Sequence, residues 1–206
     1  KYKNVSIKLK KDLLKYQIYK NKINKIKNEL RLGNTYQINF TNDKHYECSD
    51  NGFDMYMHLR NYAKPKYGFY INYDKFKILS LSPELFFKKY GDTIESYPMK
   101  GTKKRNINPT IDNQLKEELK NSNKDKAEHL MIVDLLRNDI GKIAIPGSVK
   151  VNNLYQVQSY STVHQMISKV QAKLEKSIEE IDIIKALFPG GSVTGAPKEN
   201  SMKIID

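Results

Sequence analysis

Helix-like and strand-like patterns follow one another along this chain without a repeating order, and no other feature restricts its fold as strongly. Apolar residues recur at helical spacing over residues 11–32 and 124–140, and Gly33 and Gly141 supply the stops. Residues 162–174 alternate between apolar and polar side chains over the length of a long strand. Because no strand–helix–strand repeat appears, the pattern favours an α+β fold over a doubly wound parallel sheet.

The other expected elements are shorter. We expect strands at 35–41, 67–73, 76–81, 85–89, 93–98 and 149–151. We expect helices at 52–63 and 196–206, helical character from residue 112, and a helical turn at 82–84. A further helix is expected to begin with a capping box of Ser177 and Glu180 and to run to residue 187. We also expect Lys100 to stand between a strand and a turn formed by Gly101 and Thr102.

The charge and cysteine content exclude several classes of protein. The formal net charge is +13, but the lysines are scattered, and no stacking platform or reader motif for nucleic acid accompanies them. No apolar run reaches the roughly 18 residues of a membrane helix, and no secretory signal is visible. A single cysteine, Cys48, excludes an internal disulfide framework. We therefore predict a cytoplasmic protein that binds neither nucleic acid nor membrane.

Two stretches carry residues suited to chemistry. Residues 126–141 read Lys-Ala-Glu-His-Leu-Met-Ile-Val-Asp-Leu-Leu-Arg-Asn-Asp-Ile-Gly, an amphipathic helix with charged ends. Glu128 and Asp139 are eleven helical residues apart, about 16 Å, so they cannot share one metal ion. Residues 188–198 read Phe-Pro-Gly-Gly-Ser-Val-Thr-Gly-Ala-Pro-Lys, a glycine-rich turn before a helix. Such a turn exposes backbone N–H groups that suit a carboxylate, although it can also be a plain connector.

These stretches and three others resemble the chorismate-binding enzymes. The helix at 126–141 resembles their Ala-Glu-His-x-Met-x-Val-Asp-Leu-x-Arg-Asn-Asp signature, and the loop at 188–198 resembles Phe-Pro-x-Gly-Ser-Ile-Thr-Gly-Ala-Pro-Lys. Leu-Ser-Pro-Glu-Leu-Phe-Phe at 81–87, Val-His-Gln-Met-Ile-Ser-Lys-Val at 163–170 and Gly-Asn-Thr-Tyr-Gln-Ile-Asn-Phe at 33–40 resemble further family elements. The resemblance implies a two-lobed, anthranilate-synthase-like α+β fold with stacked antiparallel sheets and outer helices. Residues 1–206 are then expected to form a partial chorismate-binding domain whose C-terminal portion is absent.

One position separates the members of this family. Residues 96–105 read Ser-Tyr-Pro-Met-Lys-Gly-Thr-Lys-Lys-Arg and resemble the Pro-Ile-Lys-Gly-Thr element of aminodeoxychorismate synthases. Anthranilate and isochorismate synthases typically carry alanine at the position of Lys100. A desolvated lysine amine can act as a covalent nucleophile, and alanine cannot.

The resemblance also implies roles for individual residues. Lys100 is the nucleophile, Glu84 is the general acid at the departing hydroxyl, and His164 orients the ring or shuttles a proton. Glu128 is a ligand of Mg²⁺. The residues expected to contact chorismate come from two places in the chain: Gly101, Thr102, Gly191, Ser192, Thr194, Gly195 and Lys198.

The implied reaction converts chorismate and ammonia to 4-amino-4-deoxychorismate, and the ammonia comes from a glutamine amidotransferase subunit or fused domain. Two alternatives remain open from the sequence: an anthranilate or isochorismate synthase, and a basic binding module without catalysis. For single residues, Glu84 can instead be an ordinary residue of a helix N-terminus, and His164 can be a core histidine.

Overall fold

The computed structural model describes residues 7–12, 14–48 and 51–206. They divide into two compact units, one formed by the described residues within 1–28 and 40–85 and the other by residues 29–39 and 86–206. Every strand pair in the described residues is antiparallel, which confirms the α+β prediction. Within the same residues no helix is both long enough and apolar enough to cross a membrane.

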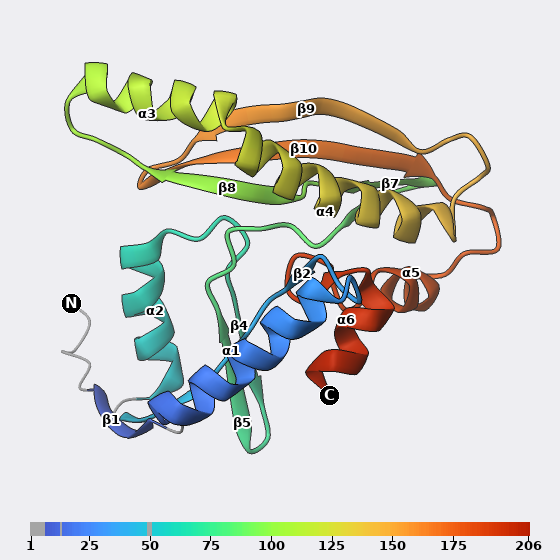
Figure 1. The fold of residues 1–206 in the computed structure, drawn as a ribbon. Coiled ribbons are helices and arrows are strands. Elements are labelled where there is room, and N and C mark those ends of the chain that lie inside the picture. Colours follow the sequence, from blue (N-terminus) through green and yellow to red (C-terminus); the bar gives the residue numbers. More distant parts are fainter. Residues whose placement is uncertain (1–6, 13, 49–50) are drawn as a thin grey trace. The chain divides into compact units, whose positions relative to one another are not determined.

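The first unit contains two antiparallel strand pairs and two helices (Figure 1). Strand β1 (Ile7–Asp12) pairs with β3 (Lys44–Cys48), and β4 (Phe69–Tyr73) pairs with β5 (Phe76–Ser80). Helix α1 (Tyr16–Arg31) begins later than predicted, whereas α2 (Gly52–Ala63) has the predicted bounds. Asn51 caps α2 by accepting a hydrogen bond from the Asp54 amide.

The expected helical turn at residues 82–84 is wrong. The Ser82 hydroxyl accepts a hydrogen bond from the Glu84 amide at 3.2 Å and donates to the Glu84 carbonyl at 2.9 Å. This side chain forms a local turn, but no helical residues follow it. Serine provides the same side-chain acceptor in a turn as at a helix N-cap, so the sequence pattern does not distinguish the two.

The second unit is built on a five-stranded sheet with β10 (Val163–Lys173) at its centre. Strand β9 (Lys150–Ser159) pairs along one edge of β10. Strands β8 (Met99–Lys104) and β7 (Thr93–Ser96) follow one another along the other edge, and β6 (Lys88–Tyr90) pairs with β7. The hairpin of β6 and β7 and the long strand at β10 were predicted.

Helices α3 (Pro109–Asn121) and α4 (Asn123–Gly141) lie along one face of this sheet (Figure 1). A core of fully or nearly buried apolar side chains fills the space between α4, α5 (Glu180–Leu187) and the sheet: Ile94, Val133, Ile140, Ile143, Ala144, Val170, Ala172, Leu174, Ile183 and Leu187. Complete burial of one such aliphatic side chain contributes about 1.5–3 kcal/mol to folding, so this core fixes α4 on the sheet.

The C-terminal segment carries the glycine-rich loop. After α5 the chain forms the short strand β11 (Gly195–Ala196), which pairs with β2 (Gln37–Ile38), and then α6 (Lys198–Ile205). The predicted capping box of α5 is wrong in its residues, because Glu179 and Asp182 form it. The observed box lies two residues after the expected one, and in both the two side chains are three residues apart, as a capping box requires.

Candidate active site

Lys100 lies in strand β8, and Gly101 beside it forms a β-bulge. Lys100 pairs with Met166 and Thr102 pairs with Gln165, so Gly101 is the extra residue between them. Its φ of +76° suits glycine, as in bulges of this type. The predicted turn at Gly101 and Thr102 is therefore wrong: both residues belong to a strand.

The bulge decides which sheet face Lys100 occupies. Residues directly opposite in a ladder share a face, and Lys100 and Lys103 pair with Met166 and His164, two positions apart on β10. The Lys103 ammonium lies 3.1 Å from the carboxylate of Glu118 on α3, which identifies this face as the one that the helices cover. Lys100 is half-buried there, and no ion pair or hydrogen bond in the described part of the chain involves its ammonium.

Glu84 belongs to the first unit, whereas Lys100 belongs to the second. The side chain of Glu84 is half-buried and follows the Ser82 turn. Its role as a general acid stays a prediction.

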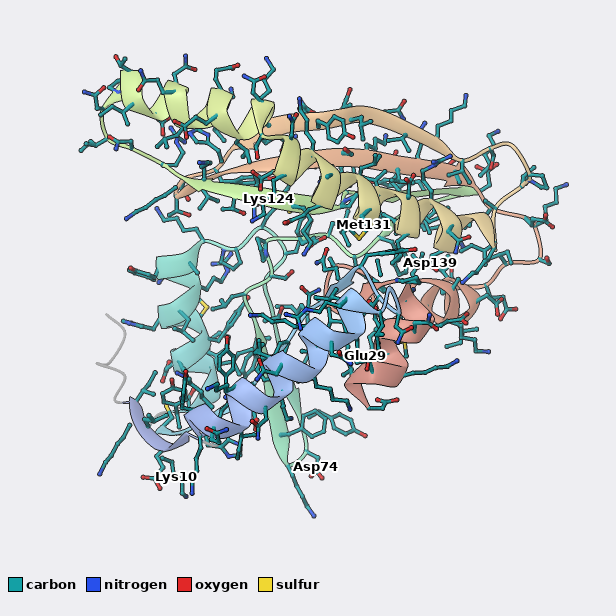
Figure 2. The ribbon with its side chains drawn as sticks, in the orientation of Figure 1. Lys10, Glu29, Asp74, Lys124, Met131 and Asp139 are labelled. Carbon is teal, nitrogen blue, oxygen red and sulfur yellow. The ribbon has the colours of Figure 1, made fainter. Side chains whose placement is uncertain are left out.

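Glu128 lies in the first half of α4, one turn after Lys124, which Figure 2 labels. Its carboxylate is 42% exposed and 3.9 Å from the Lys124 ammonium. Among the described residues, no group of three or more His, Cys, Asp or Glu side chains is placed to hold a metal ion. These residues therefore offer one carboxylate for Mg²⁺ and do not make a complete site, since Mg²⁺ requires near-octahedral oxygen coordination.

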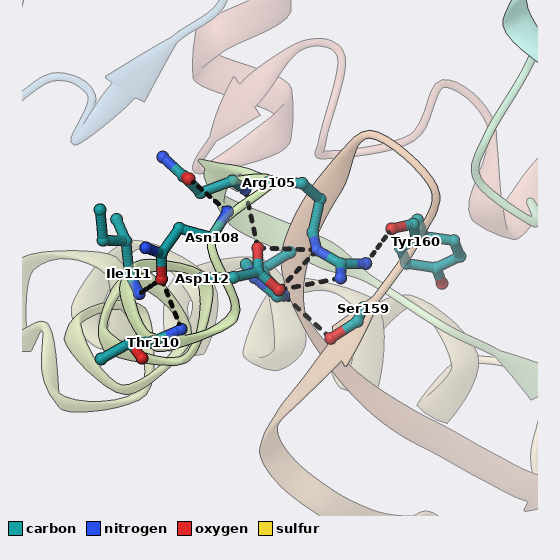
Figure 3. A network of polar contacts seen from close by, with 9 residues as sticks. Arg105, Asn108, Thr110, Ile111, Asp112, Ser159 and Tyr160 are labelled. Carbon is teal, nitrogen blue, oxygen red and sulfur yellow. Dashed lines mark hydrogen bonds and ion pairs between the residues drawn. The ribbon is translucent and has the colours of Figure 1, made fainter.

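His164 is buried on β10, and its two ring nitrogens are hydrogen-bonded to Ser159 and Asp112, which Figure 3 labels. Nδ1 lies 2.9 Å from Oγ of Ser159, at the end of β9, and Nε2 lies 3.0 Å from Oδ1 of Asp112 on α3. The imidazole is thus enclosed between β9 and α3. A role for His164 in proton transfer to chorismate stays a prediction, and none of these contacts supports it.

Asp112 is the centre of this polar network. Nε and one terminal nitrogen of Arg105 contact its carboxylate at 2.8–2.9 Å. The backbone N–H of Asn106 also donates to it at 2.8 Å. These donors, with the Arg105 side chain first, hold the pKa of Asp112 well below its ordinary value. Arg105 also donates to the Tyr160 carbonyl at 2.7 Å. The sequence does not reveal this network, because Arg105 and Asp112 lie on different elements and no motif spacing connects them with residue 159.

A second buried histidine joins α4 to the sheet. Nε2 of His129 lies 2.7 Å from Oγ of Ser168 on β10, and the Ser168 hydroxyl also accepts from the Tyr155 amide at 3.2 Å. The His129 side chain is 0% exposed, and its Nδ1 has no hydrogen-bond partner. Burial lowers the pKa of His129 to about 4, so the ring is neutral at physiological pH.

Close packing explains two of the predicted loop glycines. A Cβ on Gly191 would lie 2.6 Å from a methyl carbon of Leu135 on α4, and a Cβ on Gly195 would collide with the carbonyl oxygen of Gln37. Gly195 therefore allows β11 to approach β2. Both glycines have a structural reason that does not depend on a ligand.

The rest of the loop keeps some polar groups available. The Thr194 hydroxyl donates to the Gly190 carbonyl at 3.0 Å, and the Asn39 side chain donates to the Ser192 carbonyl at 2.6 Å. No hydrogen bond in the described part of the chain uses the backbone N–H of Gly191 or Ser192. Gly191 is buried and Ser192 is half-buried, so the Ser192 amide is the donor that an anion at this loop could reach.

Lys198 and Asp139 form a buried ion pair near this loop. The Lys198 ammonium is 2.5 Å from the Asp139 carboxylate and 3.2 Å from the Leu187 carbonyl at the end of α5. The side chains are 13% and 4% exposed, and Lys142 provides Asp139 with a second cation at 3.2 Å. The pair borders an open groove of about 570 Å³ between α4, which bears Met131 and Asp139 (Figure 2), and α6. The Lys198 ammonium is therefore already paired within the fold. Its role in substrate binding stays a prediction, which these contacts do not support.

The comparisons with known proteins identify the family. The model of the chorismate binding enzyme family matches residues 1–206, and the chain therefore belongs to that family. It is 41% identical over 177 residues to "Anthranilate synthase component 1" of Saccharolobus solfataricus, covering 86% of this chain and 42% of the relative. It is 39% identical over 188 residues to "Aminodeoxychorismate synthase component 1" of Salmonella typhimurium, covering 91% of this chain and 41% of the relative.

The solved structures agree with the predicted fold. The crystal structure of anthranilate synthase component I from Streptococcus pneumoniae matches with a TM-score of 0.82 at 26% identity, over 98% of this chain and 43% of that one. The anthranilate-synthase-like fold is thereby confirmed. The chain spans less than half the length of these relatives.

Proposed function

We propose that this chain is part of an aminodeoxychorismate synthase, which converts chorismate and ammonia into 4-amino-4-deoxychorismate, the precursor of 4-aminobenzoate and folate. Overall identity does not choose between the two kinds of relative, because it is 41% to an anthranilate synthase and 39% to an aminodeoxychorismate synthase. The observation that carries the proposal is Lys100. Its side chain is half-buried on the helix-covered face of the sheet and has no ion-pair partner among the described residues.

The proposed chemistry proceeds through a covalent lysine adduct. The unprotonated Lys100 amine attacks C2 of chorismate while Glu84 protonates the C4 hydroxyl, which leaves as water. Ammonia then forms a bond to C4, and the bond between C2 and the Lys100 nitrogen breaks. The Ser192 amide is available for a substrate carboxylate. His164 has no step in this proposal, because both of its nitrogens are engaged within the fold.

The proposal extends to metal, partner and location. We propose Glu128 as one ligand of a Mg²⁺ ion that neutralises a substrate carboxylate, with the other ligands outside the described residues. We further propose that a glutamine amidotransferase, as a subunit or a fused domain, supplies the ammonia, and that the reaction takes place in the cytoplasm. Co-purification of the natural-length protein with its amidotransferase activity, and fractionation of cells that produce it, test these two points.

The decisive experiment replaces Lys100 in the protein at its full natural length. Wild type, incubated with chorismate while ammonia is withheld, is expected to gain the mass of chorismate less one water on Lys100. Lys100→Ala is expected to lose this adduct and to form 4-amino-4-deoxychorismate much more slowly. Lys103→Ala is the matched control, because this neighbouring lysine is already paired with Glu118. Anthranilate or isochorismate as the main wild-type product, or an unchanged rate in Lys100→Ala, would refute the assignment.

The metal proposal has its own test. Glu128→Gln removes a negative charge and is expected to raise the Mg²⁺ concentration needed for half-maximal activity and to lower turnover strongly. Glu117→Gln on α3 is the control, because it removes an exposed carboxylate elsewhere. Full wild-type activity in excess EDTA would exclude the metal.

A further inference from the structure

Ser159, His164 and Asp112 form a hydrogen-bonded row that the proposed chorismate chemistry does not use (Figure 3). We propose that Ser159 is a nucleophilic serine, activated by His164, which accepts an acyl group from a small activated ester. The arrangement matches the general signature of an activated nucleophile: a hydroxyl, a base within hydrogen-bond reach, and a third group that orients the base.

The strand pairing and the exposure of Ser159 and His164 support Ser159 as the nucleophile and His164 as its base. Ser159 and His164 are direct partners in the pairing of β9 with β10, and Ser159 Oγ lies 2.9 Å from His164 Nδ1. Ser159 is exposed at the end of its strand, whereas the His164 side chain is 1% exposed. A reagent from solvent can therefore reach the hydroxyl, while the base behind it stays fixed.

The protonation of Asp112 decides which nitrogen of His164 carries the proton. Arg105 contacts both carboxylate oxygens, so Asp112 is ionised and can only accept hydrogen bonds. In the neutral imidazole, Nε2 then carries the proton that is shared with Asp112, which leaves Nδ1 as an acceptor. The Ser159 hydroxyl accordingly donates to a free lone pair, the arrangement that general-base activation of a hydroxyl requires.

Transfer of the acyl group to Ser159 needs no reactant other than the ester. Ser159 Oγ forms a bond to the acyl carbon of the ester, and the bond from that carbon to the leaving oxygen breaks. The hydroxyl proton passes to His164 Nδ1, where the Asp112 carboxylate stabilises the imidazolium, and then to the leaving oxygen. The products are an acyl-serine ester and the free alcohol. Ser159 is exposed at the end of its strand and does not line the groove of about 570 Å³ beside Lys198, so the acyl group is expected to be small, such as acetyl.

The test uses 4-nitrophenyl acetate and the protein at its full natural length, without chorismate or ammonia. We expect acetylation of Ser159, located by peptide mass mapping, and little at Ser161, an exposed serine two residues further in the same turn. Ser161 has no side-chain hydrogen bond in the described part of the chain, so it is an internal control that requires no variant. Equal acetylation of the two serines would overturn the proposal, whatever the outcome for chorismate chemistry.

Variants test whether Ser159 reacts because His164 activates it or only because it is exposed. Ser159→Ala is expected to remove the acetylated peptide, and Ser161→Ala is expected to keep it. His164→Gln is expected to slow acetylation of Ser159 by about a hundredfold, within the usual contribution of a general base. Circular dichroism checks that each variant is folded. An unchanged acetylation rate in folded His164→Gln would also overturn the proposal.

Asp112 acts through His164, as a positioning residue. In wild type we expect the ¹⁵N spectrum of the His164 imidazole to show a single tautomer with the proton on Nε2 at neutral pH. In Asp112→Asn the amide can donate or accept, so we expect a mixture of tautomers together with slower acetylation. A wild-type spectrum with the proton on Nδ1 would contradict the activation of Ser159.

Discussion

At the scale of single residues, Lys100 and Lys198 were both predicted to act on the substrate, yet their surroundings differ. The Lys198 ammonium contacts the buried Asp139 carboxylate and two carbonyl oxygens at the end of α5. The Lys100 ammonium has no such partner in the described residues. A lysine that neutralises a buried carboxylate is held by the fold, whereas an unpaired one remains available for chemistry. The structure therefore supports Lys100 as a nucleophile more strongly than Lys198 as a substrate ligand.

We predict that Lys198→Met destabilises the fold. It leaves the Asp139 carboxylate buried with only Lys142 nearby, so the free energy of unfolding is expected to fall by about 3 kcal/mol. Urea unfolding of the purified chain measures this change. Lys142→Met is the control, because that side chain is 53% exposed and its removal is expected to cost about 1 kcal/mol or less. Equal stabilities of wild type and Lys198→Met would show that the ion pair is not structural.

At the scale of elements, the sequence predicted those with strong periodicity and missed those with irregular backbones. Helix α4 and strand β10 were found because their buried residues recur at the helical and strand periods. Strand β8 was not found, because Gly101 stands in its middle and glycine commonly marks a turn. The bulge depends on the pairing with β10, which is far away in the sequence, so no local pattern reveals it.

Strand β9 was predicted only in part, again because its backbone is irregular. Only residues 149–151 were predicted, whereas the strand runs over Lys150–Ser159. Its middle contains Asn153 and Tyr155, both with positive φ, where the register with β10 shifts. Asparagine in this backbone region is common in turns, so the pattern favoured a loop. For the site, motif resemblance named Lys100, Glu84, His164, Glu128 and the glycine-rich loop, and their roles stay predictions. The contact of His164 with Asp112 was revealed by the tertiary structure alone.

The contact between α4 and the sheet is expected to depend on pH through His129. The ordinary pKa of histidine is about 6.5, and burial lowers that of His129 to about 4 in the folded chain. Between these values the unfolded chain binds a proton that the folded chain does not. Stability is therefore fully present above about pH 6.5 and is lost as the pH falls toward 4.

We predict that acidification from pH 7 to pH 4.5 costs wild type roughly 2–3 kcal/mol more than it costs His129→Gln. Glutamine can keep a hydrogen bond to Ser168 but does not titrate, so the difference between the two proteins isolates the histidine from the carboxylates. Urea unfolding at the two pH values provides the measurement. The same loss of stability in both proteins would mean that protonation of His129 does not oppose folding.

At the scale of the whole molecule, the two units differ in how much apolar surface they bury. All members of the apolar core belong to the second unit, formed by residues 29–39 and 86–206. In the first unit, Tyr56 is the one buried apolar side chain among the described residues, and α1 has no buried residue. The strands β1, β3, β4 and β5 are mostly exposed as well. Hydrophobic burial is the main favourable term in folding, so the second unit is expected to hold most of the stability.

This difference predicts the pattern of amide hydrogen exchange in the 206-residue chain. Amides in the core of a cooperative unit exchange only through its unfolding, whereas amides in poorly buried elements exchange through local opening. We therefore expect the amides of α4 and β10 to be protected at least roughly a hundredfold more than those of α1 and of the β4–β5 pair. Hydrogen–deuterium exchange with peptide mass analysis at neutral pH measures both sets in one sample. Within the second unit, the exposed β9–β10 turn serves as a control for fast exchange without unfolding of the core. Equal protection of α1 and α4 would show that the first unit is stabilised by something other than apolar burial, because its described side chains do not provide it.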